Sequence, residues 1–306
     1  MADFSILTAI GLVLRTWPFL LLRVALSGAI VLGYAAWVGG GAGLGAVSGA
    51  VLGAPGEGAA YGAAGGFVLA SALLIWLRAY LLYLVKGGHI AVLVAAYDGQ
   101  PLPGGFGQIA YALDVLKARF AEVNVLFVLD GLIRGVLRTI CGLITALTGL
   151  VGLRPVANVL NAVLYVSTMF VDELILARNI RTGGDPFSGA QDALVLYAQN
   201  AVAILRNAVV LTLVMALLAA GLFALVVGPF GALAALFPGP LAYAGVALAG
   251  IAALTLVYAV AEPFCIACLL QTFIAVTDGQ QPDPEWRGRL EGASARFRDL
   301  GARAIR

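Results

Sequence analysis

Residues 201–228 read AVAILRNAVVLTLVMALLAAGLFALVVG, and Arg206 is the single charged side chain among them. A helix crosses the hydrocarbon core of a bilayer with about 20 apolar residues, so this stretch predicts a transmembrane helix. The sixth and longest such stretch contains Pro263, at which we expect a kink. The sequence therefore predicts an all-α polytopic integral membrane protein with about six transmembrane helices, the other five at 17–38, 59–86, 121–151, 155–177 and 240–277.

The composition of the whole chain agrees with a membrane protein. Of its 306 residues, 62% are hydrophobic and 11% are charged, and the mean hydropathy is +1.00. Soluble domains are about 45–50% apolar and about 25% charged, so this chain has too few polar residues to cover a water-facing surface. A formal net charge of +2 argues against a nucleic-acid partner.

A run of regularly spaced glycines lies between the first two predicted spans. Gly41, Gly45, Gly49 and Gly53 recur at every fourth position, which places them on one helical face as a glycine zipper. Residues 40–54 make roughly 22 Å of helix at about 1.5 Å per residue, which is short of a full crossing. We therefore expect a short or re-entrant helix, whose glycines either let neighbouring helices pack closely or form the seam of a homo-oligomer.

The distribution of Lys and Arg predicts the orientation in the membrane. Twelve of them flank two loops or lie near the C-terminus, whereas Arg154 and Glu57 are the charges of the opposite loops. By the positive-inside rule, we expect a multi-pass protein of the plasma membrane, of the bacterial inner-membrane type, with a cytoplasmic C-terminus. The twelve are Lys86, Lys117, Arg119, Arg178, Arg181, Arg206, Arg287, Arg289, Arg296, Arg298, Arg303 and Arg306.

The cytoplasmic loops resemble one another. Residues 99–104 and 184–189 share the pattern GxPxxG, and each is followed by an amphipathic segment. This succession of span, turn, amphipathic helix and span predicts an internal repeat, with the amphipathic helices lying along the cytoplasmic membrane surface. We expect one transmembrane domain over 1–277 and a basic cytoplasmic tail over 278–306, with the repeated loops near 98–105, 182–189 and 278–284.

Carboxylates inside the predicted spans are candidates for a binding site, because ionisable groups in a membrane are costly unless they are paired or hydrated. Asp172 and Glu173 are adjacent and point about 100° apart on a helix. At least one of them therefore needs a basic partner from elsewhere, for which Arg23 and Arg78 are the candidates.

Glu262 directly precedes Pro263. Proline removes an amide donor from the helix and leaves a backbone carbonyl free in the preceding turn. A carboxylate beside a broken turn is an arrangement that transporters use for cations. We therefore predict either a cation site at Glu262 or a kink that serves packing.

Aromatic residues suggest how a cation could be held. Trp76 and Tyr80 lie four residues apart within 59–86, where they could present aromatic faces to an ammonium group, or belong to the core or the interfacial belt. Enzyme motifs such as GxSxG, the P-loop and HExxH are absent from the sequence, which has one His and three Cys. We therefore expect no enzyme, no cofactor and no metal site.

From about Leu77 to the end, the chain resembles the membrane core of the choline transporter-like family, a pattern shared by bacterial membrane proteins of unknown function. The resemblance rests on the segment 174–180 leading into 187–190 and 205–207, and on Cys265 to Cys268 followed by Asp278-Gly279. It implies a transporter-like protein for a small organic cation or a headgroup-related solute. The charge partners would be Asp172, Glu173 and Glu262.

A different class of function is also open from the sequence. The glycines at 41–53 and the amphipathic helices are typical of a non-transporting membrane scaffold or an oligomeric interaction protein. The expected partners are therefore membrane lipid, with either a small cationic solute or further copies of the chain or other membrane proteins.

Overall fold

The computed structural model describes residues 3–118, 136, 171–234 and 240–304, and the side chains of 74–79, 230, 233–234, 240–249 and 251–252 are not among those described. These residues form helices joined by turns. Four helices are long and apolar enough to cross a membrane, at Trp17–Val51, Tyr80–Tyr97, Ala201–Pro229 and Ala253–Thr277. The predicted span 121–151, apart from residue 136, and residues 155–170 of the next one lie outside the described part of the chain.

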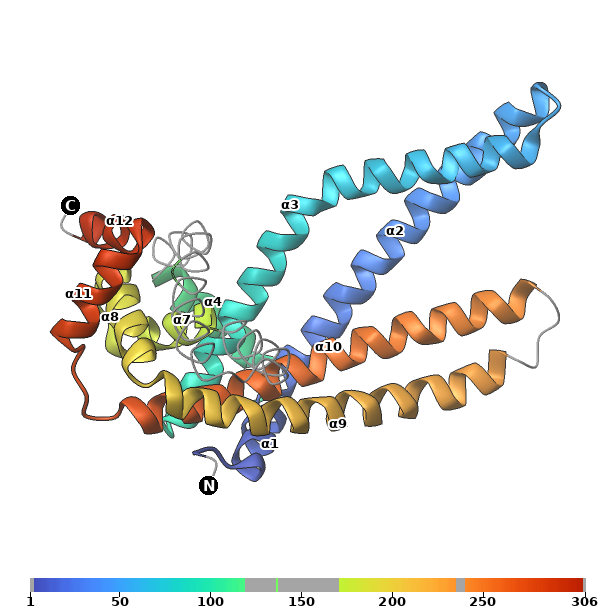
Figure 1. Ribbon diagram of the computed structural model, residues 1–306. Coiled ribbons are helices and arrows are strands. Elements are labelled where there is room, and N and C mark those ends of the chain that lie inside the picture. The colour runs from blue at the N-terminus through green and yellow to red at the C-terminus, as the bar shows by residue number, and fades with distance from the viewer. Residues whose placement is uncertain (1–2, 119–135, 137–170, 235–239, 305–306) are drawn as a thin grey trace, which may run out of the picture.

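Two helical hairpins extend from a common body and diverge from each other (Figure 1). The first hairpin consists of α2 (Trp17–Val51) and α3 (Pro55–Tyr97), and the second of α9 (Ala201–Ala234) and α10 (Pro240–Thr277). The predicted stretch 240–277 matches α10, which continues through Pro263.

The close packing of the first hairpin depends on glycine. A Cβ atom added at Gly41 would overlap the carbonyl oxygen of Gly62, and one added at Gly45 would overlap that of Gly58. A Cβ at Gly49 would lie 2.6 Å from the carbonyl oxygen of Ala54. Backbone therefore packs directly on backbone, which small residues at helix interfaces allow.

The structure differs from the expected short or re-entrant helix at 40–54. Residues 40–51 are the last part of α2, which runs without a break for 35 residues, and residues 52–54 form the turn before α3. Glycine costs about 1 kcal/mol relative to alanine inside a helix, but no proline interrupts α2 after Pro18 and contact with α3 stabilises the helical form.

Gly53 does not share the packing face of Gly41, Gly45 and Gly49. It lies in the turn before α3 with a φ of 72° and has nothing within 4 Å of an added Cβ, so the prediction for Gly53 was wrong.

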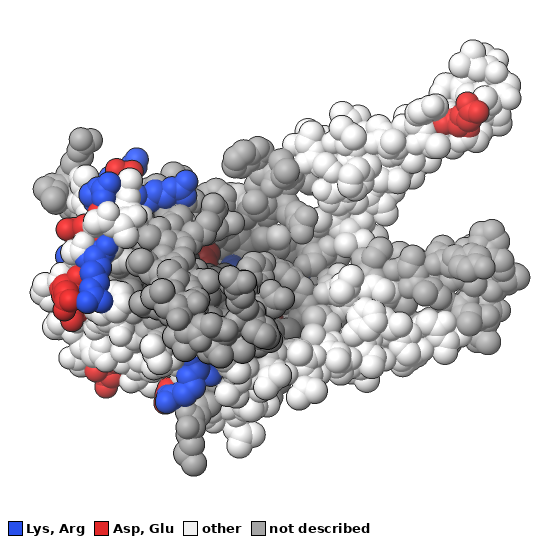
Figure 2. Space-filling model, in the orientation of Figure 1, with Lys and Arg blue, Asp and Glu red and all other residues white. Residues whose placement is uncertain are grey.

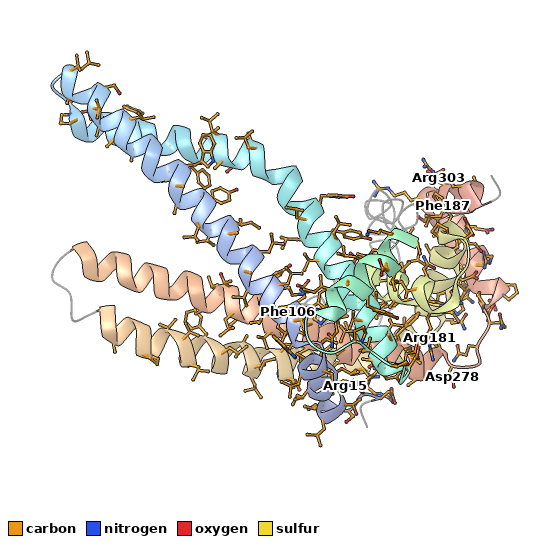
Figure 3. All side chains as sticks on the ribbon, turned by 180° about the vertical axis from the view of Figure 1, so that it is seen from behind. Arg15, Phe106, Arg181, Phe187, Asp278 and Arg303 are labelled. Atoms are coloured by element: carbon orange, nitrogen blue, oxygen red, sulfur yellow. The ribbon has the colours of Figure 1, made fainter. Side chains whose placement is uncertain are left out.

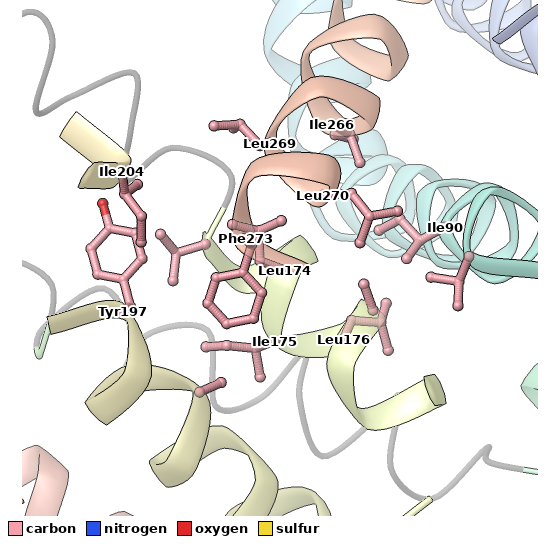
Figure 4. Close-up of a cluster of buried hydrophobic side chains, with 14 of the residues drawn as sticks. Ile90, Leu174, Ile175, Leu176, Tyr197, Ile204, Ile266, Leu269, Leu270 and Phe273 are labelled. Atoms are coloured by element: carbon pink, nitrogen blue, oxygen red, sulfur yellow. The ribbon is translucent and has the colours of Figure 1, made fainter. Parts of the chain in front are cut away.

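The body buries a hydrophobic core. Side chains of α3, α7, α8 and α10 meet there, and Figure 4 shows Ile90, Ile175, Tyr197 and Phe273 among them. The remaining helices of the body are α4 (Gly107–Ala118), α7 (Val171–Thr182), α8 (Pro186–Gln199), α11 (Pro284–Ala293) and α12 (Ala295–Ala304), while α1 (Ile6–Arg15) precedes α2.

The amphipathic segment at 190–201 and the C-terminal segment pack together in this body. In α8, residues 193–198 are all buried, and α8 contacts α7, α11 and α12. Leu290, Phe297 and Leu300 anchor α11 and α12, because each has no exposed surface. The predicted basic tail therefore folds back onto α8, instead of leaving α8 to lie on a membrane surface.

Charge is distributed unevenly over the molecule. Figure 2 shows basic and acidic side chains gathered on the body around α11 and α12, whereas the hairpins are almost free of them. From residue 24 to residue 77 the sequence has one charged side chain, Glu57, in the first turn of α3. The hairpins therefore suit hydrocarbon and the body suits water.

A small polar cluster fastens the N-terminal segment to α9. The Asn207 amide donates to Asp3 Oδ2 at 2.6 Å, and Arg206 Nη2 donates to the same oxygen at 2.7 Å. The hydrogen bond from Asn207, together with Arg206, lowers the pKa of the Asp3 carboxyl below its ordinary value of 3.8. The ionised carboxylate is thus the form that holds the segment.

We expect Asp3→Asn to lower stability by at most about 1 kcal/mol at neutral pH, since the carboxylate is partly exposed. Because the folded pKa is depressed, this contribution is present above the unfolded pKa and is lost as the pH falls through the folded value. Thermal unfolding of the variant and of the wild type should therefore converge at acidic pH. A constant difference across the pH range would show that the carboxylate charge is not what matters.

Candidate functional site

Four charged side chains from four helices meet where the hairpins join the body. Arg23 of α2 pairs with Glu262 of α10 through Nη1 and Oε2. Lys86 of α3 places its Nζ 2.8 Å from Glu262 Oε1 and also pairs with Glu173 of α7. We call these four residues the ion network.

The ion network is buried and balanced in charge. Arg23, Glu173 and Glu262 are 3%, 2% and 5% exposed, whereas the side chain of Lys86 is 19% exposed. Removing a charge from water costs several kcal/mol, and ion pairing offsets much of that cost. In the ion network two cations face two carboxylates, so each buried charge has a partner of opposite sign. These pairs link α2, α3, α7 and α10 to one another.

A cavity of about 300 Å³ lies between α2, α3 and α10. Its lining includes Ser27 and Tyr34 from α2, Leu82 from α3, and Thr255 and Tyr258 from α10. Its volume is at the lower end of the range for small-molecule sites, which starts at about 300 Å³.

The ion network lies one helical turn from this cavity on each of the three helices. Ser27 is four residues from Arg23, Leu82 four residues from Lys86, and Tyr258 four residues from Glu262. Residues four apart are neighbours on a helix surface, and in each case the network residue is the one nearer the body (Figure 1). The Tyr258 side chain also hydrogen-bonds Glu262. The ion network therefore lies one turn beyond the cavity, and none of its four residues is among those that line it.

His89 follows Lys86 by three residues on α3 and contacts Thr16. His89 Nε2 is 2.9 Å from the Thr16 hydroxyl, which also donates to the Leu12 carbonyl at 2.9 Å. Since a hydroxyl has one proton to donate, Thr16 accepts from His89. The imidazole stacks on Phe19 with ring centroids 5.1 Å apart. His89 is thus a packed residue of the body, whose Nδ1 is buried and has no hydrogen-bond partner within the described part of the chain.

The structure brings together some of the residues that the sequence proposed. Glu173 and Glu262 share Lys86, and Arg23 pairs with Glu262. Asp172 is half-buried and acts electrostatically on Tyr83.

Of the two predicted aromatic residues, the structure describes the side chain of Tyr80 alone. Tyr80 is half-buried on α3 and is not among the residues that line the cavity, and the side chain of Trp76 lies outside the described part. Tyr34 and Tyr258 take this place. Arg23, Ser27 and Tyr34 are spaced along one face of a helix, and this spacing could have predicted that α2 contributes to the cavity wall.

Lys86 is also placed differently from the expectation of a cytoplasmic loop. It lies inside the candidate span Tyr80–Tyr97, since α3 continues through Gly87-Gly88. A Cβ at Gly88 would meet the ring of Phe19 at 3.2 Å. These glycines therefore serve helix packing and do not end the helix.

The three predicted repeat loops lie close together in the body. Arg181 binds Asp98 with an N–O distance of 3.0 Å, and the Asn200 amide donates to Gln280 at 2.8 Å. A second cavity of about 140 Å³ lies here, lined by Arg178, Arg181 and Asp278 among others, and Figure 3 labels the last two on this side of the body. Burial lowers the pKa of Arg178 from its ordinary value.

Metal binding finds no support in the described residues. No group of three or more His, Cys, Asp or Glu side chains among them could hold a metal ion. Cys265 and Cys268 are buried and free within α10.

Comparison with known proteins finds no match to this chain among family models, among characterised proteins or among solved structures.

Proposed function

We propose that this protein is a multi-pass plasma-membrane protein that binds and transports a small organic solute carrying an ammonium group, choline-like or related to a lipid headgroup. The observation that carries the proposal is the cavity between α2, α3 and α10, with the buried ion network one helical turn away from it. The resemblance of the C-terminal two thirds to the choline transporter-like family supports the same solute class.

Lys86 suggests how such a solute could be recognised. Its ammonium group lies between the carboxylates of Glu173 and Glu262, which is the environment that another ammonium would require. Lys86 is also the most exposed member of the ion network, and a lysine side chain is a flexible stem with a compact charge. The negative charge of the two carboxylates would also attract the ammonium of a solute that enters the cavity.

Tyr34 and Tyr258 supply aromatic faces in the cavity wall. A cation over an aromatic ring gains about 0.5–2 kcal/mol, more when it is removed from water. The hydroxyls of Ser27 and Thr255 add acceptors for the solute. We infer that the ammonium binds against the tyrosines, one turn from the carboxylates.

The orientation proposed from the sequence fits the distribution of charge. Positive charge is favoured on the cytoplasmic side, and α11 and α12 carry five of the six arginines between residue 287 and the end. We therefore place the body with the C-terminus in the cytoplasm and the tips of the hairpins on the opposite side. A bacterial inner membrane and about six spans in total belong to this proposal.

The homo-oligomeric scaffold is the less favoured alternative. Gly41, Gly45 and Gly49 contact the backbone of the first hairpin itself, so their packing face is already covered within one chain.

Choline is expected to raise the melting temperature of the purified full-length protein, because a ligand that binds the folded state stabilises it by mass action. Acetate and other anions alone should not. Tyr34→Leu removes one aromatic face and should weaken choline binding about five- to thirtyfold. Tyr61→Leu is the matched control, because Tyr61 is exposed on the same hairpin, away from the cavity.

Uptake of radiolabelled choline into proteoliposomes then separates binding from transport. Absence of any stabilisation by choline, ethanolamine or betaine would refute the proposed function. Equal loss of binding in the Tyr34 and Tyr61 variants would exclude the cavity as the site.

A further inference from the structure

Arg23 has one hydrogen-bonding edge that the ion network does not use. Its Nη1 pairs with Glu262, while Nε and Nη2 are buried and have no hydrogen-bond partner within the described part of the chain. Arg23 is 3% exposed, so water outside the protein does not reach these donors. Buried donors that stay unpaired are destabilising and call for a partner.

The geometry of a guanidinium defines which partner fits. Nε–H and one N–H of Nη2 point in the same direction and form two parallel hydrogen bonds with a carboxylate or a phosphate. Arg23 is one turn from Ser27, which lines the cavity. One turn of four residues corresponds to about 6 Å along the helix, a length that a small molecule with two charged ends can bridge.

The charge balance of the ion network points to the same kind of ligand. Two cations already face two carboxylates. A solute with a bare positive charge would leave the buried site with an excess charge, which is costly in a low-dielectric environment. A solute that carries one positive and one negative group adds no net charge.

We propose that the solute is a zwitterion, whose ammonium lies against Tyr34 and Tyr258 and whose carboxylate or phosphate binds the Nε–Nη2 edge of Arg23. This inference rests on the proposed function, since it uses the same cavity. It assigns Arg23 as a binding residue for an oxyanion, in addition to its role as the partner of Glu262.

The inference is tested by calorimetric binding to the full chain in nanodiscs with matched probes. Choline carries the ammonium alone, betaine adds a carboxylate, and acetate and inorganic phosphate are the anions alone. Phosphocholine adds a phosphate, which carries one negative charge when the titration is run below its second pKa of about 6. We expect betaine or phosphocholine to bind at least about tenfold more tightly than choline, as hydrogen bonds between charged groups at a buried site imply. The better of the two identifies the oxyanion.

Arg23→Lys keeps the positive charge for Glu262 but removes the planar edge. The variant should lose the preference for zwitterions over choline, and thermal unfolding in the same nanodiscs shows whether it is folded. Arg289→Lys is the matched control and should keep the preference, because Arg289 forms an exposed pair with Glu285 on α11.

Each failure has a separate meaning. If choline binds the wild type as tightly as betaine and phosphocholine do, the zwitterion inference is overturned and the proposed function stands. If the anions alone bind as tightly as the zwitterions, the inference is overturned as well. If no ammonium compound binds, the proposed function fails. The wild-type comparison decides the matter even if Arg23→Lys does not fold.

Discussion

Glu262→Gln is expected to destabilise the protein by about 3–5 kcal/mol, the cost of breaking a buried ion pair by removing one partner. The substitution keeps the size and shape of the side chain but removes the charge that balances Arg23 and part of Lys86. Thermal or denaturant unfolding in detergent measures the difference. Glu285→Gln is the control, because the Glu285–Arg289 pair is exposed and should contribute no more than about 1 kcal/mol.

A second substitution separates loss of charge balance from loss of packing. In Arg23→Gln with Glu262→Gln, the remaining Lys86 and Glu173 still form a pair, and the network is neutral again. The double variant should therefore be clearly more stable than the sum of the two single effects predicts. Additive effects would contradict the ion network as a coupled unit.

Gly45→Ala is expected to cost about 3 kcal/mol, at the upper end of the usual range for overpacking. The new methyl group would overlap the carbonyl oxygen of Gly58, and backbone atoms cannot rotate away as a side chain does. The two helices must therefore move apart, and the contact between them weakens along the hairpin.

Gly43→Ala is the matched control and is expected to change the stability in the opposite direction. Gly43 lies two residues away in the same helix, and an added Cβ meets nothing within 4 Å. Alanine is favoured over glycine in a helix by about 1 kcal/mol, so this variant should be more stable than the wild type. Similar melting temperatures for the two variants would refute the close packing of α2 on α3. A changed oligomer mass in detergent for Gly45→Ala would instead favour a seam between chains.

Long apolar runs were the part of the fold that the sequence predicted well. The stretch 201–228 lies within α9, and 240–277 coincides with α10, because hydropathy reports directly on which segments prefer hydrocarbon. The ends of helices near glycine were predicted poorly. Glycines are weak helix formers in isolation, but in the fold Gly41 faces the backbone of α3 and Gly88 faces the ring of Phe19. Tertiary contact decides such positions.

The sequence predicted the acidic residues of the candidate site, but it did not predict which basic residues pair with them. A carboxylate in an apolar segment is visible in the sequence, so Glu173 and Glu262 could be proposed. Their partners come from α2 and α3, and spacing along one helix carries no information about which helices meet. Lys86 was missed for this reason and because an adjacent pair of glycines suggested the end of a helix.

The nearly uncharged first hairpin also has a consequence for biogenesis. Its tip contains the turn around Gly53 and Pro55, and Glu57 is the one charge between residues 24 and 77. In the orientation proposed above, this carboxylate is the one charge of residues 24–77 that has to pass through the hydrocarbon, where an acidic residue at mid-depth costs about 3 kcal/mol. Because the glycines of α2 pack directly on the backbone of α3, the two helices can leave the translocon as a preassembled pair, in one insertion event.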